Sequence, residues 1–298
     1  MGSPLRLTVP ELPELPDAWQ LVVDEFEAAE AALSRFRDSS ELTRLNRRAG
    51  SGQAGVMSTR LRIALVAAER ARRVTEGRFD PRVLDDLDRL GYRGAPLAAE
   101  PAPDIRTVRR GPAVRRKGHA GLIVDDRVDL GGIGKGLTLR WAAARLERSG
   151  CTTFLLEAGG DVVSRGQPPD ANAWVVGIED PSGRAGHLAA ICCRPGSEAV
   201  ATSSMRINHW RIGGRDVHHL VDPATGEPGG SGLWSVTVTG PDPAWAEVWS
   251  KVLFLAGSGA IADEARARGI AAWWVDARGA LAMTPAARST TAWVAGED

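Results

Sequence analysis

The feature that most constrains the fold of this chain is a series of short apolar segments between residues 173 and 239. Turn-forming residues separate these segments, which is typical of strands joined by turns. The segments cover 173–178, 186–193, 198–202, 217–221 and 233–239. Helical and strand patterns elsewhere are mixed with them without a strict βαβ alternation, so the sequence predicts an α+β fold with mixed sheets.

Helical periodicity is clearest outside that β-rich region. Helices are predicted at 18–36, 59–76, 136–149, 243–256 and about 258–268. Further strands are predicted at 153–157 and 271–276, the latter being expected to end the folded part. A short hairpin around 125–126 is predicted to join 122–124 to 127–130.

The length of 298 residues is compatible with one or two domains of roughly 100–200 residues each. We expect a single compact domain over 18–285. A Pro-rich N-terminal segment at 1–17 precedes it, and a C-terminal tail at 286–298 follows it.

Composition excludes several function classes. Basic and acidic side chains balance at 37 each, which gives no broad electrostatic reason to bind nucleic acid or an anionic membrane. No segment approaches the roughly 18–20 uninterrupted apolar residues of a membrane span, and 1–17 lacks the apolar region of a signal peptide. The three cysteines form no CxxC motif, which fits a reduced compartment. A cytoplasmic location is therefore expected, although a chain trimmed of its leader would look the same.

The segment from Asp129 to Gly136 (DLGGIGKG) places a glycine-rich loop between a strand and a helix. Glycines let backbone N–H groups approach an anionic ligand, and the helix N-terminus adds a favourable dipole. Lys135 would add a positive charge for a phosphate. The loop matches neither the Walker A nor the GxGxxG pattern, so a tight strand–helix turn is an equally good interpretation of the spacing alone.

A second polar segment, HHLVDPATG at 218–226, places His219 three residues before Asp222 at a strand end. This spacing can present an imidazole and a carboxylate to one ligand, as a general base or a metal partner. The alternative, favoured when the segment is considered by itself, is a β-turn in which Asp222 caps its own backbone.

Taken in chain order, these and other short motifs resemble the ApbE-type FAD:protein FMN transferases. The similarity runs from about residue 27 to 257. The matching motifs are SRFRDSSELTRLN at 34–46, GRFDP at 77–81 with LGY at 90–92, DLGGIGKG at 129–136, EAGGDVVSRG at 157–166, TS at 202–203, HLVDPATG at 219–226 and SVTV at 235–238. Seven motifs in the same order make the resemblance specific.

The resemblance implies a T-fold-related α+β domain with an FAD cleft. It also implies that the FMN half of FAD is transferred, with Mg²⁺ or another divalent metal, to a Thr or Ser hydroxyl of a target flavoprotein, releasing AMP. The implied FAD contacts are Phe36, Phe79, Asp80, Pro81, Asp129, Lys135, Glu157, Val221 and Thr225. The incoming hydroxyl needs a base, for which His219 and Asp222 are the best candidates. The implied partners are FAD and an acceptor flavoprotein, with no nucleic acid and no membrane span.

The chain departs from the family where the metal is held. The family motif A-D-A-x-x-T, whose Asp and Thr bind the metal together with an oxygen of the D-L-G-G loop, corresponds to AEVWSK at 246–251. Glu247 keeps a carboxylate, but Lys251 replaces the threonine and cannot ligate a cation when protonated. The resemblance thus implies either a metal held by Gly132, Glu247 and Ser250 or a charge role for Lys251. A simple ion pair between Glu247 and Lys251 carries equal weight.

Three hypotheses follow from these patterns. The first is a working FMN transferase, and the second is an FAD-binding protein with lost or altered transfer. The third is a flavin-free descendant of the family. We expect the first, because the glycine loop and the HLVDPATG turn match the family while only the metal-binding helix has diverged.

Overall fold

The computed structural model describes residues 4–10, 18–92, 111–117, 121–184 and 186–296. The chain forms two compact units. Unit 1 contains Met1–Phe26, Lys135–Arg206 and Gly230–Asp298, and unit 2 contains Glu27–Gly134 and Ile207–Gly229. The α+β class predicted from the sequence is confirmed.

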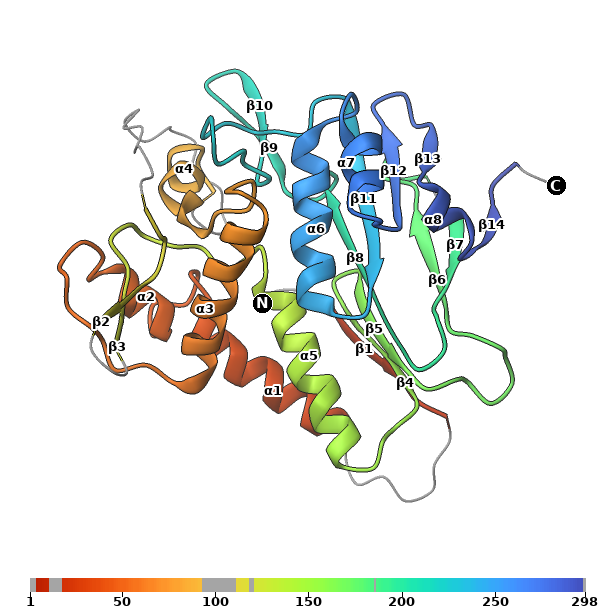
Figure 1. Ribbon diagram of the computed structural model, residues 1–298, viewed down its shortest axis with the longest axis horizontal. Helices are drawn as coiled ribbons and strands as arrows, with labels where there is room; N and C mark the ends of the chain where they lie inside the picture. Colours follow the sequence, from red (N-terminus) through yellow and green to blue (C-terminus); the bar gives the residue numbers. More distant parts are fainter. Residues whose placement is uncertain (1–3, 11–17, 93–110, 118–120, 185, 297–298) are drawn as a thin grey trace. The chain divides into compact units, whose positions relative to one another are not determined.

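The centre of unit 1 is a seven-stranded sheet in the order β1-β4-β5-β8-β11-β12-β13 (Figure 1). Its strands are β1 (Leu5–Thr8), β4 (Phe154–Ala158), β5 (Asp161–Arg165), β8 (Ser197–Ser204), β11 (Leu233–Gly240), β12 (Ala272–Asp276) and β13 (Leu281–Met283). Every neighbouring pair in this order is antiparallel. Side chains alternate between the two faces, so each strand contributes to two cores.

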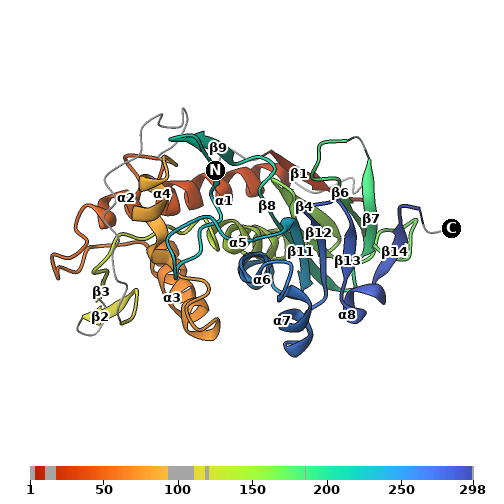
Figure 2. The same ribbon diagram turned by 90° about the horizontal axis from the view of Figure 1, so that it is seen from above.

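Helices cover one face of this sheet (Figure 2). These helices include α1 (Ala18–Leu33), α5 (Gly134–Arg148), α6 (Pro243–Ala256) and α7 (Ile261–Ala267), and the remaining helices are described below. Val22 of α1 and Leu146 of α5 pack on Phe154 and Leu156 of β4. Ala246 of α6 packs on Ala199 and Ala201 of β8, where small side chains let the helix approach the sheet closely.

A second sheet covers the opposite face. It has the order β14-β7-β6 and contains β6 (Val175–Glu179), β7 (His187–Cys192) and β14 (Thr291–Val294). Ile178 and Ile191 of this sheet share a core with Val162, Val200 and Trp273 of the large sheet. Unit 1 is therefore a helix layer, a seven-stranded sheet and a three-stranded sheet.

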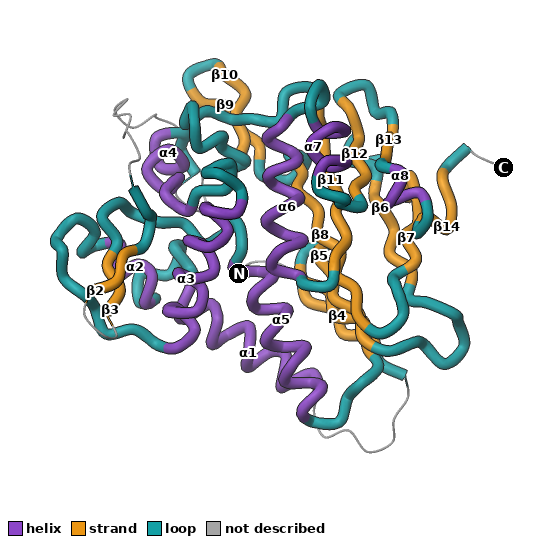
Figure 3. The backbone as a smooth tube through the Cα atoms, viewed as in Figure 1, coloured by secondary structure: helices purple, strands orange, loops and turns teal. Residues whose placement is uncertain are grey.

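Unit 2 is built from helices and two-stranded hairpins (Figure 3). Its elements are α2 (Glu41–Asn46), α3 (Thr59–Val74), a 3₁₀ turn η1 (Pro81–Val83), α4 (Leu84–Arg89), and the hairpins β2 (Arg115–Lys117) with β3 (Gly121–Ile123) and β9 (His209–Ile212) with β10 (Arg215–His218). Leu87 and Leu90 pack against Trp210, Val217 and Val221. That core joins two segments that are far apart in the sequence.

The prediction of a hairpin around 125–126 was wrong. Strand β3 pairs with β2, and the backbone of 128–129 has other partners. The Asn46 side chain bonds both the N–H and the carbonyl of Val128, and the Asp129 N–H donates to the Pro81 carbonyl. Since these backbone groups are used, they cannot form a β-ladder.

The fold also extends beyond the limits expected from the sequence. Strand β1 lies within the Pro-rich segment at 1–17 and pairs with β4. A strand at 271–276 was expected to end the folded part, but after β12 the chain adds β13, α8 (Pro285–Arg288) and β14. No helix in the described ranges is long and apolar enough to cross a membrane.

Candidate functional site

Four charged side chains gather in unit 1, and we call them the charge cluster: Lys135, Asp161, Glu247 and Lys251. Lys135 stands in the first turn of α5, Asp161 begins β5, and the other two are one turn apart on α6. Lys135 Nζ lies 2.6 Å from Asp161 Oδ2, and Lys251 Nζ lies 3.4 Å from Glu247 Oε1. The cluster thus balances two cations against two carboxylates.

Gly136 brings α5 and α6 together at this cluster. A Cβ at position 136 would lie 2.4 Å from the Pro243 carbonyl oxygen and 2.6 Å from Ala244 Cα, so the packing requires glycine. The Gly136 N–H donates to Glu247 Oε2 at 2.8 Å. One of the backbone donors that a helix N-terminus leaves unpaired is therefore satisfied by α6.

The charges of the cluster influence one another. Burial by itself lowers the pKa of Lys135, but the carboxylates of Asp161 and Glu247 outweigh it and hold that pKa above its ordinary value. Burial raises the pKa of Glu247, which is 1% exposed, while the ammonium groups of Lys251 and Lys135 act in the opposite direction. Lys135 is consequently a cation at neutral pH.

Residues of β8 and α6 form further hydrogen bonds near the cluster. The Thr202 N–H donates to Asp161 Oδ1 at 2.9 Å, which fixes this carboxylate beside Lys135. Ser203 Oγ lies 2.8 Å from Ser250 Oγ, and Ser250 Oγ donates to the Glu247 carbonyl at 3.0 Å. The two residues of the TS motif thus link β8 to Asp161 of β5 and to Ser250 of α6.

The part of the predicted metal site that lies in unit 1 does not fit a divalent cation. Such a cation needs several oxygen ligands, but the Glu247 oxygens contact a backbone N–H and an ammonium, and the Ser250 hydroxyl is paired. Within the described ranges, no three His, Cys, Asp or Glu side chains form a group that could hold a metal ion. Gly132 belongs to unit 2, so the full set of Gly132, Glu247 and Ser250 stays a prediction.

In unit 2, Asp129 of the glycine loop is held by Arg35. Arg35 Nε lies 2.7 Å from Asp129 Oδ2, and Arg35 Nη2 donates to the Tyr92 carbonyl at 2.7 Å. The Gly131 N–H donates to Asp129 Oδ1. Both charged side chains are buried, so the loop that contains Gly132 is fixed by a buried ion pair.

Aromatic rings gather around the same arginine. The Arg35 guanidinium carbon lies 4.2 Å from the centre of the Phe36 ring and 4.8 Å from that of Tyr92. Phe36 contacts Tyr92 edge to face at 5.7 Å, and Tyr92 stacks on Trp210 at 5.3 Å. Phe36 is 55% exposed, so this cluster presents an aromatic surface that a planar ligand can stack on.

The HLVDPATG segment contains the predicted base. The His219 ring lies 6.0 Å from the Tyr92 ring, and His219 Nδ1 lies 3.3 Å from the Asn208 carbonyl oxygen. Asp222 Oδ1 accepts the Ala224 N–H, while its carbonyl accepts the N–H groups of Thr225 and Gly226. The aspartate thus caps the turn, as the β-turn interpretation proposed.

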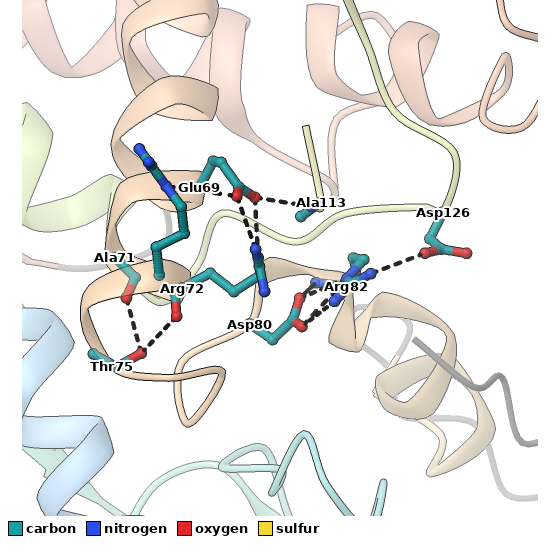
Figure 4. Close-up of polar contacts among 9 residues, drawn as sticks. Glu69, Ala71, Arg72, Thr75, Asp80, Arg82, Ala113 and Asp126 are labelled. Atoms are coloured by element: carbon teal, nitrogen blue, oxygen red, sulfur yellow. Dashed lines mark hydrogen bonds and ion pairs between the residues drawn. The ribbon is translucent and has the colours of Figure 1, made fainter. Parts of the chain in front are cut away.

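The GRFDP motif forms the buried corner shown in Figure 4. The Asp80 carboxylate contacts the Arg82 guanidinium at 2.7 Å, and Arg82 also lies 3.6 Å from Asp126. Thr75 at the end of α3 accepts the Phe79 N–H. Phe79, Asp80 and Pro81 are all buried. Asp80 therefore has a charge partner within the protein.

The remaining predicted FAD contacts are Glu157 in unit 1 and Val221 and Thr225 in unit 2. Glu157 is on β4, where its carboxylate lies 3.9 Å from Arg6. Val221 is buried in the core of unit 2 and forms a β-bridge with Pro228. Thr225 Oγ1 accepts the Glu227 N–H in the turn. The structure thus gathers Lys135, Glu247 and Ser250 in unit 1, and Phe36, Asp129 and His219 near Arg35 or Tyr92 in unit 2.

Two charged residues of these sites were missed by the sequence analysis. Asp161 was quoted within a motif without a role, although its place after two glycines at a strand start was an available signal. Arg35 lies in the 34–46 motif between Ser34 and Phe36, and nothing in its local sequence indicates that it is buried with Asp129.

Comparison with known proteins places the chain in context. The family model described as the ApbE family matches residues 1–274. A curated FAD:protein FMN transferase of Klebsiella pneumoniae is 31% identical over 153 residues, which cover 51% of this chain and 43% of that protein. The chain thus aligns with less than half of that relative. One from Vibrio cholerae is 28% identical and covers 80% of this chain and 74% of the relative.

Solved structures with the same fold include an ApbE protein from Thermotoga maritima, with a TM-score of 0.83 and 24% identity. The flavin transferase ApbE from Vibrio cholerae has a TM-score of 0.78 and 24% identity. Each comparison covers 97% of this chain and 96% of the other. The fold expected from the sequence motifs is therefore confirmed over nearly the whole chain.

Proposed function

Because the chain belongs to the ApbE family, we propose that it transfers the FMN half of FAD to a Thr or Ser hydroxyl of an acceptor flavoprotein and releases AMP. The observation that supports this most is Lys135, an ammonium in the first turn of the 15-residue helix α5, beside the glycine loop. A cation at a helix N-terminus favours phosphate, and FAD contains a pyrophosphate.

In the proposed reaction, the acceptor hydroxyl oxygen attacks the FMN phosphorus of FAD. The bond from this phosphorus to the bridging oxygen breaks, and AMP leaves with that oxygen. Negative charge develops on the phosphate oxygens, where the Lys135 ammonium would stabilise it. Asp161 is a positioning residue, since it holds the Lys135 ammonium at 2.6 Å.

The hydroxyl proton needs an acceptor, and His219 is the proposed base. A carbonyl oxygen only accepts hydrogen bonds, so the contact with Asn208 requires the proton on Nδ1 and leaves the lone pair on Nε2. Asp222, the other predicted catalytic residue, would support the base by ordering the turn that follows it.

The proposed FAD contacts of unit 2 centre on Phe36, whose exposed ring is suited to stacking on the flavin. The other proposed contacts are Phe79, Asp80, Pro81, Asp129, Glu157, Val221 and Thr225. The resemblance implies a divalent metal at Gly132, Glu247 and Ser250, but the oxygens of Glu247 and Ser250 are already paired and do not fit one. Lys251 is the other source of positive charge.

A second candidate function is FAD binding without transfer. The ion pair between Glu247 and Lys251 favours it, because it stands where the resemblance to the family implies a metal. The two functions differ in whether FAD stays intact.

Incubation with FAD and a threonine-containing acceptor peptide, with EDTA or with excess Mg²⁺ or Mn²⁺, tests the proposal. We expect AMP in the supernatant and FMN covalently attached to the peptide, measured by chromatography and mass spectrometry. Bound FAD that stays intact under all these conditions would support the second candidate instead.

The His219→Asn variant tests the assigned base. Turnover should fall about 100-fold or more, while the dissociation constant of FAD should change by less than about twofold. His209→Asn is the matched control, since this histidine lies on the neighbouring strand β9 and is exposed. Equal losses of turnover and affinity in His219→Asn would show a binding role.

A further inference from the structure

In the charge cluster of unit 1, Lys251 lies one helical turn from Glu247, the carboxylate that the sequence analysis assigned to a metal. We propose that the ammonium of Lys251 replaces a divalent cation, so that this chain binds the pyrophosphate of FAD without a metal ion. The inference rests on the proposed function for the identity of the ligand. It concerns the chain's own residues Lys135, Asp161, Glu247 and Lys251.

The first argument is the charge balance. Two lysines and two carboxylates give the cluster a net charge of zero. With a threonine at position 251, the same cluster would carry a net negative charge and would repel a phosphate unless a cation were bound. The Lys251 ammonium supplies that positive charge as part of the chain, without a bound ion. Because the cluster is then neutral, a phosphate can approach it.

The second argument is geometry. Lys251 Nζ lies 3.4 Å from Glu247 Oε1, which is longer than the usual 2.7–2.9 Å of a charge-assisted hydrogen bond. Lys135 in contrast lies only 2.6 Å from Asp161. The Lys251 side chain is 20% exposed, and an ammonium has several donors. Lys251 is therefore held loosely enough to donate to a phosphate while it stays beside Glu247.

The third argument is the chemistry of the neighbouring oxygens. Glu247 Oε2 accepts the Gly136 N–H, and the Ser250 hydroxyl is bonded to Ser203 and to the Glu247 carbonyl. A cation at Glu247 would have to compete with these donors and with the like charge of Lys251. The side chains present thus favour an ammonium at this place over a divalent ion.

The test compares FAD binding in excess EDTA and in millimolar Mg²⁺, measured by titration of the flavin fluorescence. The dissociation constant of the unmodified protein should agree within about twofold between the two conditions. Mn²⁺ titrated into the protein without FAD, followed by electron paramagnetic resonance, should show no saturable site. An affinity that rises about tenfold or more with Mg²⁺, or a stoichiometric Mn²⁺ site, would overturn the proposal.

Two variants separate charge from ligation. Lys251→Met removes the charge and adds no oxygen, so FAD affinity should fall about tenfold or more, and Mg²⁺ should not restore it. Lys251→Thr removes the same charge but adds a hydroxyl one turn from Glu247. It should therefore gain a saturable Mn²⁺ site and recover FAD affinity in Mg²⁺.

Lys251→Arg retains the positive charge and should retain binding in EDTA, which separates the charge from the packing of the side chain. Unchanged affinity in Lys251→Met would contradict the proposal.

AMP release decides the proposed function independently: release only with Mg²⁺ would support the function but not this inference. No release in either condition would contradict the function, while the binding and Mn²⁺ measurements would still decide the role of Lys251.

Discussion

At the residue scale, Arg35 contacts several different groups near the predicted site of unit 2. It pairs with Asp129 at 2.7 Å, donates to the Tyr92 carbonyl and lies against the rings of Phe36 and Tyr92. Its side chain is 6% exposed. A single buried guanidinium thus links the glycine loop to the aromatic cluster.

Replacing Arg35 by methionine should destabilise the protein by about 3 kcal/mol, because it leaves the buried Asp129 carboxylate without its cation. Urea denaturation followed by tryptophan fluorescence measures this loss. The double variant Arg35→Met with Asp129→Asn should recover part of the stability, since no unpaired charge is buried. A double variant that is as unstable as the sum of both single changes would show that the ion pair is not the cause.

At the element scale, the closest approach in the described part of the site is that of α5 to the start of α6. The backbone of Gly136 lies so near Pro243 and Ala244 that a methyl group has no room. This approach allows the Gly136 N–H to reach Glu247. The glycine of the loop is thus explained by helix packing, in addition to any contact with a phosphate.

Gly136→Ala should cost about 1–3 kcal/mol, because the new methyl group forces α5 and α6 apart. Gly134→Ala is the matched control in the same helix. Its Cβ would meet nothing nearer than Leu33 Cδ1 at 3.8 Å, so the higher helix propensity of alanine should leave stability equal or slightly raised. Thermal unfolding of both variants distinguishes the two effects, and equal changes would contradict the role of the close approach.

Elements with a strong local pattern were predictable from the sequence. The helices expected at 59–76 and 243–256 are Thr59–Val74 and Pro243–Ala256, because apolar periodicity and end signals agree there. The hairpin predicted around 125–126 does not form, because the Asn46 side chain, far away in the sequence, bonds the backbone groups of Val128.

The same limit applies to the site. Lys135 and Glu247 were recognisable by motif, whereas the role of Asp161 depends on the antiparallel pairing that brings β8 beside β5. That pairing places the Thr202 N–H at its carboxylate. Such contacts follow from which strands pair in the sheet, and a local sequence pattern does not predict that pairing.

At the scale of the whole molecule, stability near neutral pH depends on individual groups. The formal net charge is zero, so overall charge repulsion is small. His218 is one such group, because burial lowers its pKa and the nearby His209 lowers it further, against a hydrogen bond with the Gly229 backbone. The neutral imidazole is therefore the form that the folded state prefers.

The free energy of unfolding should fall as the pH decreases below about 6.5, because the unfolded chain then binds a proton that the folded protein holds more weakly. Above that value the contribution of His218 should be fully present. The expected loss is about 1.4 kcal/mol for each unit by which the pKa is lowered. Urea denaturation at several pH values measures it, and His218→Gln should have the shallower dependence. An equal slope in both proteins would contradict the assignment.

The order of the two units along the chain has a consequence for protein synthesis. Strand β1 pairs with β4, and the long segment Glu27–Gly134 of unit 2 stands between them. At roughly 5–20 residues per second, the ribosome completes β4 about 7–30 seconds after β1. Unit 2 likewise waits for Ile207–Gly229. Neither unit can complete its core until most of the chain has been translated, so the nascent chain carries unpaired strand edges during much of its synthesis.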